Sequence, residues 1–187
     1  FLSARIDISW RKKAINKFKK DNPQHILDVA TGTADMALMA YSLLKPLQIT
    51  GIDISEGMLE VGRKKIEKEG LTGKIQLHTG DAETIKFADN TFDAVMVAFG
   101  VRNFENLEKG LSEMYRVLRP GGRIVILEFS RPQRFPFKQL YNTYFKYVLP
   151  LIGRLTSRDV RAYTYLFESV QAFPEGDPFL QILSQTG

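Results

Sequence analysis

The stretch from His25 to Asp53 constrains the fold more than any other part of this chain. An apolar run leads into a turn of small residues around Gly32, a helix-forming segment follows over residues 35–44, and a second apolar run ends in Asp53. A strand, a tight turn, a helix, a second strand and a carboxylate in this order are typical of a βαβ unit that binds a nucleoside. The alternative is an ordinary βαβ turn without a ligand, because short glycine motifs often match by chance.

Each part of this unit has a physical role. Gly32 allows a ligand to approach the backbone closely, and the helix that follows begins with free N–H groups. A carboxylate about 20 residues after the turn accepts hydrogen bonds from a ribose diol. We therefore expect Gly32, Asp53 and the neighbouring Ile54 to contact a cofactor.

The turn differs from the fingerprint of dinucleotide-binding proteins. Residues 31–34 hold one glycine where that fingerprint has three, so a pyrophosphate would find little bare backbone. Asp28 precedes the turn and Asp35 follows it, and both would repel a diphosphate. Acids on both sides of the turn suit a cofactor with a cationic end, and S-adenosylmethionine carries an ammonium and a sulfonium. We expect Asp28 to orient the turn or to meet that ammonium.

The composition limits the available chemistry. The chain has no cysteine, which excludes disulfides, thiolate catalysis and a Cys-ligated metal. The two histidines, His25 and His78, lack metal-ligand spacing, so no metal is expected. The net charge of +5 lies largely in basic clusters on helix-forming segments, which favours solvated helix faces. No apolar run is long enough to span a bilayer, so we expect a cytoplasmic protein that can associate with an anionic membrane.

Further strands and helices alternate along the chain, as in an α/β protein. The remaining predicted elements are strands at Lys74–Thr79, Phe92–Phe99 and Arg123–Phe129, helices at Ile8–Phe18, Ser55–Lys68 and Leu107–Leu118, and a turn at Arg119–Gly122. Ser55 is expected at the N-cap of its helix. Together with the strands at His25–Ala30 and Gln48–Ile54, these elements predict an open, doubly wound and mostly parallel sheet.

Residues 1–187 are interpreted as a single domain. Its expected parts are an N-terminal helix over 1–22, a cofactor-binding core over 23–130, a helical lid over 131–178 and the start of a C-terminal part over 179–187. The lid is expected over the carboxyl ends of the strands, where open α/β sheets bind ligands. Because the chain starts at Phe1 and stops after a helix-forming segment, we expect pieces at both ends, including the last strands, to be missing.

Residues 28–35, Asp-Val-Ala-Thr-Gly-Thr-Ala-Asp, resemble motif I of class I S-adenosylmethionine-dependent methyltransferases, which have a Rossmann-like fold. More narrowly, they are similar to the C-methyltransferases of menaquinone and ubiquinone biosynthesis. Other stretches that resemble this family are 53–59, 80–83, 99–103, 113–122, 127–130, 148–153 and 163–170. Gly100–Asn103, together with the region around Pro150, narrows the resemblance to the quinone enzymes.

The resemblance implies particular cofactor contacts. Thr33 would contact the cofactor in the turn, Asp53 at the ribose, and Asp81 with Ala82 at the adenine. Ala98 occupies a position that is a cofactor contact in the family and often a serine there, so only a backbone contact is expected from it. The implied substrate is a polyprenyl quinol, namely demethylmenaquinol or its ubiquinone-pathway equivalent.

Methyl transfer from a sulfonium needs aligned reactants and exclusion of water, but no metal and no covalent nucleophile. A quinol ring carbon becomes a good nucleophile when a ring hydroxyl loses its proton, so a base or a cation should lie at the pocket. Arg102 is the first candidate, as a cation that lowers the pKa of that hydroxyl. Asn103 would orient the ring oxygen, Asp7 would act as a base from the N-terminal helix, and Tyr141 is a further candidate. The alternative for Arg102 is a salt bridge to an acid on a helix.

The lid segment is rich in aromatic residues that could line a groove for a polyprenyl tail: Phe137, Tyr141, Tyr144, Phe145 and Leu149. The alternative for these side chains is packing between helices. The expected partners are the quinol and, peripherally, a membrane surface; a homodimer is compatible with the sequence. Nucleic acid is not expected, because aromatic residues do not interleave with the basic clusters.

Three other functions stay open at this point. The first is methylation of another small molecule, such as a sterol or tocopherol precursor. The second is an NAD-dependent oxidoreductase, which the single-glycine turn disfavours. The third is a non-enzymatic domain that binds nucleotides or nucleic acid, which the basic charge alone would allow.

Overall fold

The computed structural model of the chain describes residues 4–130, 135, 139, 169–174 and 176–186. The chain forms two compact units, one of residues 1–128 with 185–187 and one of residues 129–184. The expected lid segment, including Tyr141 and the aromatic residues of the proposed groove, falls almost entirely outside the described residues. The first unit carries every other predicted site residue.

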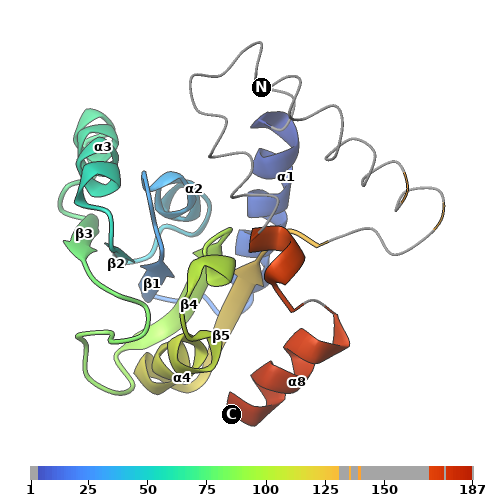
Figure 1. The fold of residues 1–187 in the computed structure, drawn as a ribbon. Helices are drawn as coiled ribbons and strands as arrows, with labels where there is room; N and C mark the ends of the chain where they lie inside the picture. Colours follow the sequence, from blue (N-terminus) through green and yellow to red (C-terminus); the bar gives the residue numbers. More distant parts are fainter. Residues whose placement is uncertain (1–3, 131–134, 136–138, 140–168, 175, 187) are drawn as a thin grey trace. The chain divides into compact units, whose positions relative to one another are not determined.

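The first unit is built on a five-stranded parallel sheet (Figure 1). Its strands are β1 (His25–Val29), β2 (Gln48–Asp53), β3 (Ile75–Thr79), β4 (Phe92–Ala98) and β5 (Leu118–Leu127). Their spatial order is β3-β2-β1-β4-β5, and every neighbouring pair is parallel. The predicted open parallel sheet is therefore confirmed, and the carboxyl ends of its strands meet at one edge.

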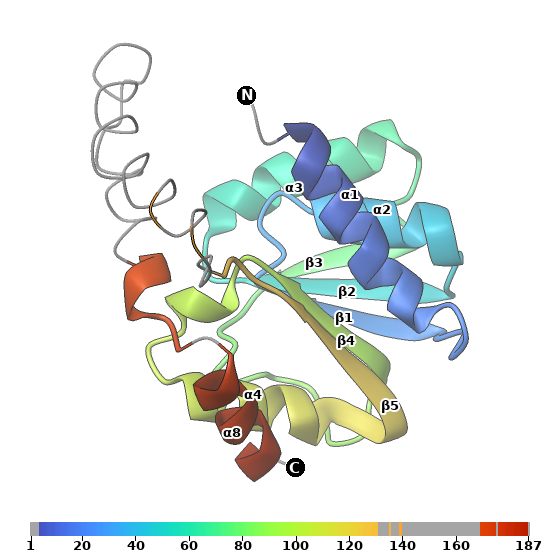
Figure 2. The same cartoon turned by 90° about the vertical axis from the view of Figure 1, so that its right-hand side faces the viewer.

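Helices cover both faces of this sheet (Figure 2). The elements on one face are α1 (Ala4–Ile15), the 3-10 turn η1 (Asn16–Phe18), α2 (Asp35–Leu44) and α3 (Glu56–Lys68). On the other face lies α4 (Leu107–Val117), which follows the 3-10 turn η2 (Val101–Asn103). The second unit contains most of α8 (Asp177–Thr186), whose Phe179 packs against Phe173 with ring centroids 5.1 Å apart.

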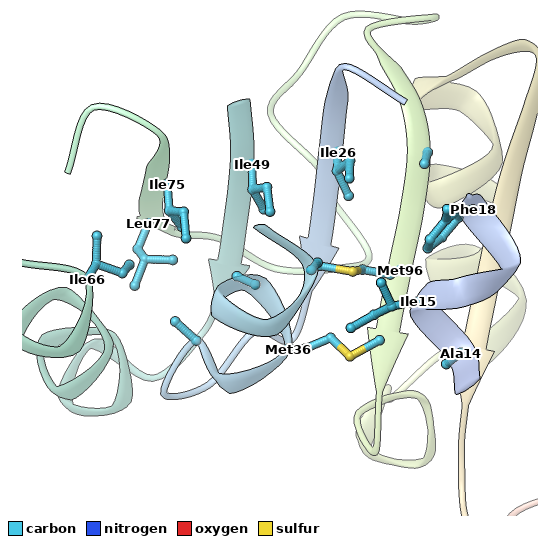
Figure 3. Packing of buried hydrophobic residues seen from close by; sticks show 14 of the residues in the cluster. Ala14, Ile15, Phe18, Ile26, Met36, Ile49, Ile66, Ile75, Leu77 and Met96 are labelled. Atoms are coloured by element: carbon cyan, nitrogen blue, oxygen red, sulfur yellow. The ribbon is translucent and has the colours of Figure 1, made fainter. Parts of the chain in front are cut away.

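The main core lies between the sheet and the layer of α1, α2 and α3 (Figure 3). Apolar side chains from neighbouring strands point to this face, and the helices fill the space above them. The fully or almost fully buried members labelled in the figure are Ile15, Phe18, Ile26, Met36, Ile49, Ile66, Ile75 and Met96. Burial on both sides of β1 and β4 explains why these strands are nearly continuous apolar runs.

Three strands, β1, β2 and β4, end one residue earlier than the sequence predicts. Ala30 and Phe99, expected as the last residues of their strands, have φ angles of +52° and +61°. Residues other than glycine adopt this left-handed conformation only at an energetic cost, so the chain turns sharply at both strand ends.

One local prediction is wrong, and another is confirmed. The expected turn at Arg119–Gly122 is part of β5: Phe92 pairs with Leu118 and Ala94 with Arg123, so the four residues bulge out of a continuing strand. Gly121 supports this bulge with a φ of +79°. Ser55 is at the N-cap of α3, as predicted, although its side chain makes no capping hydrogen bond.

Gly62 allows α3 to pack closely on the sheet, because a Cβ there would lie 2.8 Å from Leu77 Cδ1 and 3.2 Å from Ala34 Cβ. We expect Gly62→Leu to lower the free energy of unfolding by about 1–3 kcal/mol through overpacking. Gly57 on the same helix has no atom within 4 Å of its would-be Cβ, so Gly57→Leu is the matched control and should cost nothing. Urea unfolding compares the two; an equal loss in both would contradict this account.

Candidate functional site

A pocket opens at the carboxyl edge of the sheet, where β1, β2, β3 and β4 end. Its lining comes from the loops that follow these strands and comprises Ala30, Asp53, Ile54, Gly80, Asp81, Ala82, Gly100, Asn103 and Phe104. The structure thus brings together five of the predicted site residues. These are Asp53, Ile54, Asp81, Ala82 and Asn103.

Asp53 at the end of β2 is held by two backbone amides. Its Oδ2 accepts a hydrogen bond from Gly32 N at 2.8 Å, and its Oδ1 accepts one from Ser55 N at 2.9 Å. Because a carboxylate has about four acceptor positions, Asp53 can still accept hydrogen bonds from a diol in the pocket. The two bonds fix the direction of the carboxylate and tie the β1–α2 turn to the start of α3.

Close contact between two loops shapes the base of the pocket. Thr31 N donates to Ile52 O at 3.0 Å, and Gly32 follows with a φ of +56°. A Cβ on Gly100 would lie 2.6 Å from the Cβ of Ala30, so only glycine lets the loop after β4 pass the loop after β1 at this distance. Both residues line the pocket.

Asp28 lies beneath the turn and outside the pocket lining. It is 1% exposed, and its Oδ2 accepts a 2.6 Å hydrogen bond from Thr31 Oγ1. Its Oδ1 is buried and has no hydrogen-bond partner among the described residues. Burial raises the pKa of Asp28 to about 7, although the Thr31 hydroxyl and the nearby Arg11 act in the opposite direction. This bond links Asp28 to the turn, and a contact with the cofactor's ammonium stays a prediction.

Thr33 and Ala98 also lie outside the lining of the pocket. The Thr33 hydroxyl donates to Asp35 Oδ2 at 2.7 Å and accepts from Lys65 Nζ at 2.9 Å, while Lys65 pairs with Asp35 at 2.7 Å. Thr33 thereby joins the start of α2 to α3. Ala98 is the last residue of β4 and pairs with Leu127.

The three predicted catalytic residues occupy different surroundings. Arg102 Nη1 bonds to Glu128 Oε1 at 2.6 Å and to the carbonyl of Phe99 at 2.7 Å, and both charged side chains are largely buried. Its ion pair therefore involves an acid just after β5, where the expected alternative was an acid on a helix. Asp7 on α1 lies 3.6 Å from Arg11 Nε, away from the pocket lining, whereas Asn103 lines the pocket.

The sequence reasoning missed a pair of charged side chains that fixes the loop after β3. Arg116 donates to the carbonyls of Ile85 and Phe87 at 2.8 and 2.9 Å, and Glu113 accepts from Ile85 N at 2.8 Å. Their mutual ion pair has a distance of 2.7 Å, and it lowers the pKa of Glu113. Both residues lie on α4, so they hold the segment that follows Asp81 from outside. Their spacing of three residues on one helix was the available signal.

The raised pKa of Asp28 has a consequence for stability. The folded protein keeps the proton of Asp28 up to about pH 7, whereas an unfolded chain releases it near about pH 4. Between these values the folded state binds more protons, so this residue lowers the free energy of unfolding as the pH rises. Asparagine does not titrate, so Asp28→Asn removes this effect. Between pH 4.5 and pH 8, the free energy of unfolding of the variant should therefore rise relative to that of the wild type by on the order of a few kcal/mol. Urea unfolding at both pH values measures this, and a pH-independent difference would contradict it.

Comparison with known proteins agrees with this geometry. A demethylmenaquinone methyltransferase of Bacteroides fragilis is 54% identical over 186 residues, which is 100% of this chain and 76% of that protein. The ubiquinone/menaquinone biosynthesis C-methyltransferase UbiE of Geotalea daltonii is 48% identical over 100% of this chain and 79% of its own length.

Solved structures show the same fold. The phosphoethanolamine N-methyltransferase 2 of Haemonchus contortus, in complex with S-adenosyl-L-methionine, has a TM-score of 0.63 at 22% identity, covering 88% of this chain and 33% of that one. The model of the ubiE/COQ5 methyltransferase family matches residues 1–187. On the strength of that match and of the relatives above, the chain belongs to the ubiE/COQ5 methyltransferase family.

Proposed function

We propose that this protein transfers the methyl group of S-adenosylmethionine to a ring carbon of a polyprenyl quinol. Demethylmenaquinol is the first substrate to consider, because the Bacteroides fragilis relative, which is 54% identical, is named a demethylmenaquinone methyltransferase. The observation that carries the proposal is the pocket in which Asp53, fixed by Gly32 and Ser55, faces Asp81 and Ala82. Family membership leaves an NAD-dependent oxidoreductase without support.

The pocket residues divide between the parts of an adenosine. Asp53 would accept hydrogen bonds from the ribose hydroxyls, in agreement with the orientation that its two backbone donors impose. The Ile54 side chain is 75% exposed in this pocket and offers an apolar surface to the adenine ring. Asp81 and Ala82 would contact the adenine from the loop after β3. Gly100 and Asn103 then lie on the side where the rest of the cofactor and the acceptor would meet.

The chain's own residues would supply alignment and charge. The in-line displacement needs the quinol carbon held opposite the sulfonium, with water excluded. Arg102 would stabilise the developing phenolate through directed hydrogen bonds, while Glu128 holds the guanidinium in place. Because Glu128 offsets part of the positive charge of Arg102, the guanidinium would act on the phenolate more through directed hydrogen bonds than through its net charge. Asn103, next in sequence and in the pocket lining, would orient the ring oxygen.

A polyprenyl substrate implies contact with a membrane surface. Within the described ranges, no helix is long and apolar enough to cross a bilayer. The net charge of +5 and the exposed Lys12, Lys13, Lys17 and Lys20 support peripheral attraction to anionic lipid.

The assignment of Asp53 has a direct test. Asp53→Ala should weaken binding of S-adenosylhomocysteine by about 10- to 100-fold, because hydrogen bonds to a charged acceptor contribute about 1.5–3 kcal/mol each. Isothermal titration calorimetry measures the dissociation constant. Glu69→Ala, an exposed acid at the end of α3, is the control and should leave it unchanged. Unaltered affinity in Asp53→Ala would refute the ribose contact.

The reaction and the role of Arg102 can be tested together. Transfer of a labelled methyl group from S-adenosylmethionine should be faster into demethylmenaquinol than into a ubiquinone precursor. Arg102→Lys should reduce turnover by about 10²- to 10³-fold through loss of directed donors, with S-adenosylhomocysteine binding within about twofold of wild type. Lysine keeps the charge beside Glu128, which limits damage to the buried ion pair. Equal losses in turnover and affinity would remove Arg102 from the catalytic residues.

A further inference from the structure

The segment over residues 8–20, in α1 and η1, concentrates the positive charge of the chain. It holds six lysine and arginine residues and no acid, which exceeds the net charge of +5, so the rest of the chain is close to neutral. Five of the six are exposed lysines: Lys12, Lys13, Lys17, Lys19 and Lys20. Among the described residues, no acid forms an ion pair with these lysines. Their charge is therefore available to a partner outside the chain.

The other side of this segment packs into the core. Ala14, Ile15 and Phe18 are buried, and α1 contacts α2 and β5. Figure 2 shows α1 beside α2 in the helical layer on this face of the sheet. A helix with one buried apolar stripe presents its polar residues to the outside. The lysines thus form one exposed basic surface, which we call the α1 surface.

Two large apolar side chains extend the α1 surface. Ile8 and Trp10 are 42% and 40% exposed. Trp10 precedes Arg11, whose guanidinium carbon lies 5.2 Å from the ring centroid of Phe99, just after the end of β4. The apolar end of the surface therefore lies toward the carboxyl edge of the sheet, where the pocket opens. The lysines follow the chain away from that edge, toward the start of β1.

We propose that the α1 surface docks the protein on an anionic lipid bilayer, with Ile8 and Trp10 in the headgroup region and the lysines against lipid phosphates. Anionic headgroups attract lysine side chains, and a tryptophan ring prefers the boundary between headgroups and acyl chains. Positive charge alone would suit any polyanion. The exposed apolar pair at its end favours a bilayer over a nucleic acid or an acidic protein.

Docking in this orientation has a consequence for the substrate. It brings the carboxyl edge of the sheet, with the pocket, close to the membrane surface. A polyprenyl quinol is held in a bilayer by its apolar tail, so its ring would reach the pocket over a short distance. The choice of a lipid partner rests on the proposed function, whereas the surface itself is defined by charge and exposure.

Trp10 is the single tryptophan of the chain, so its fluorescence reports directly on this surface. With vesicles of equal parts phosphatidylcholine and phosphatidylglycerol, we expect its emission to shift to shorter wavelengths. Brominated acyl chains in the same vesicles should quench it. Vesicles of phosphatidylcholine alone should cause neither change, and sodium chloride at about 0.5 M should weaken the binding, because salt screens the attraction between lysines and headgroups.

Paired charge variants locate the contact. Lys13→Gln/Lys17→Gln removes two charges from the α1 surface and should lower the vesicle partition coefficient by about 25-fold, or about fivefold for each lysine. Lys64→Gln/Lys68→Gln is the matched control, because it makes the same change of net charge on the exposed side of α3. It should lower the coefficient by less than about threefold. Sedimentation with the vesicles measures both.

Three results would overturn the proposal: equal weakening by the two pairs of substitutions, vesicle binding without quenching of Trp10, or binding of an RNA oligonucleotide without binding of the vesicles. The proposed function is tested separately, by calorimetry with S-adenosylhomocysteine and by methyl transfer to demethylmenaquinol dispersed in detergent. If these succeed and vesicle binding fails, only the docking surface is refuted. If they fail and the vesicle results hold, the proposed function falls and the α1 surface stands, since its measurements need no substrate.

Discussion

The geometry of the pocket depends on the two hydrogen bonds that Asp53 accepts from the amides of Gly32 and Ser55. They join the turn after β1 to the turn after β2, at the point where two parallel strands end side by side. A carboxylate in this position satisfies amides that would otherwise lack partners at the starts of two loops. It also presents its remaining acceptor positions to the pocket in a fixed direction. The same side chain therefore stabilises the fold and prepares the site.

Backbone strain gathers around the same edge of the sheet. Ala30, Ala34 and Phe99 have positive φ angles without being glycine, and Gly100 passes Ala30 with no room for a side chain. Conformations of this kind cost of order 1–3 kcal/mol each and persist where surrounding contacts determine them. Here the buried core under β1 and β4 supplies those contacts, so the rigid sheet holds two strained loops at the distance that the pocket needs.

The charged side chains near this edge of the sheet differ in how completely they are paired. Arg102 and Glu128 satisfy each other, and Arg116 and Glu113 hold the loop after β3. Arg11, Asp7 and Asp28 are instead incompletely paired. This contrast matters because a fully satisfied buried network makes its surroundings rigid, whereas a partly satisfied one costs stability. The two kinds of cluster lie on loops and helices that end at the same pocket or beside it.

The sequence by itself determined the succession of strands and helices along the chain, the parallel sheet and the position of Asp53 and Ile54 at a strand end, because these follow from apolar periodicity and from the rule that ligands bind at strand ends. Asp81 and Ala82 were expected at the pocket from the family resemblance. Only the tertiary structure decided which partners the charged residues take. The bond between Arg102 and Glu128 joins residues from different loops, and the bulge at Arg119–Gly122 depends on the register of β5 against β4. Arg11 has no motif of its own, and its contact with the Phe99 ring exists only because α1 packs beside the end of β4. Local sequence patterns determine the helices and strands, whereas contacts between residues far apart in the sequence depend on how those helices and strands pack together.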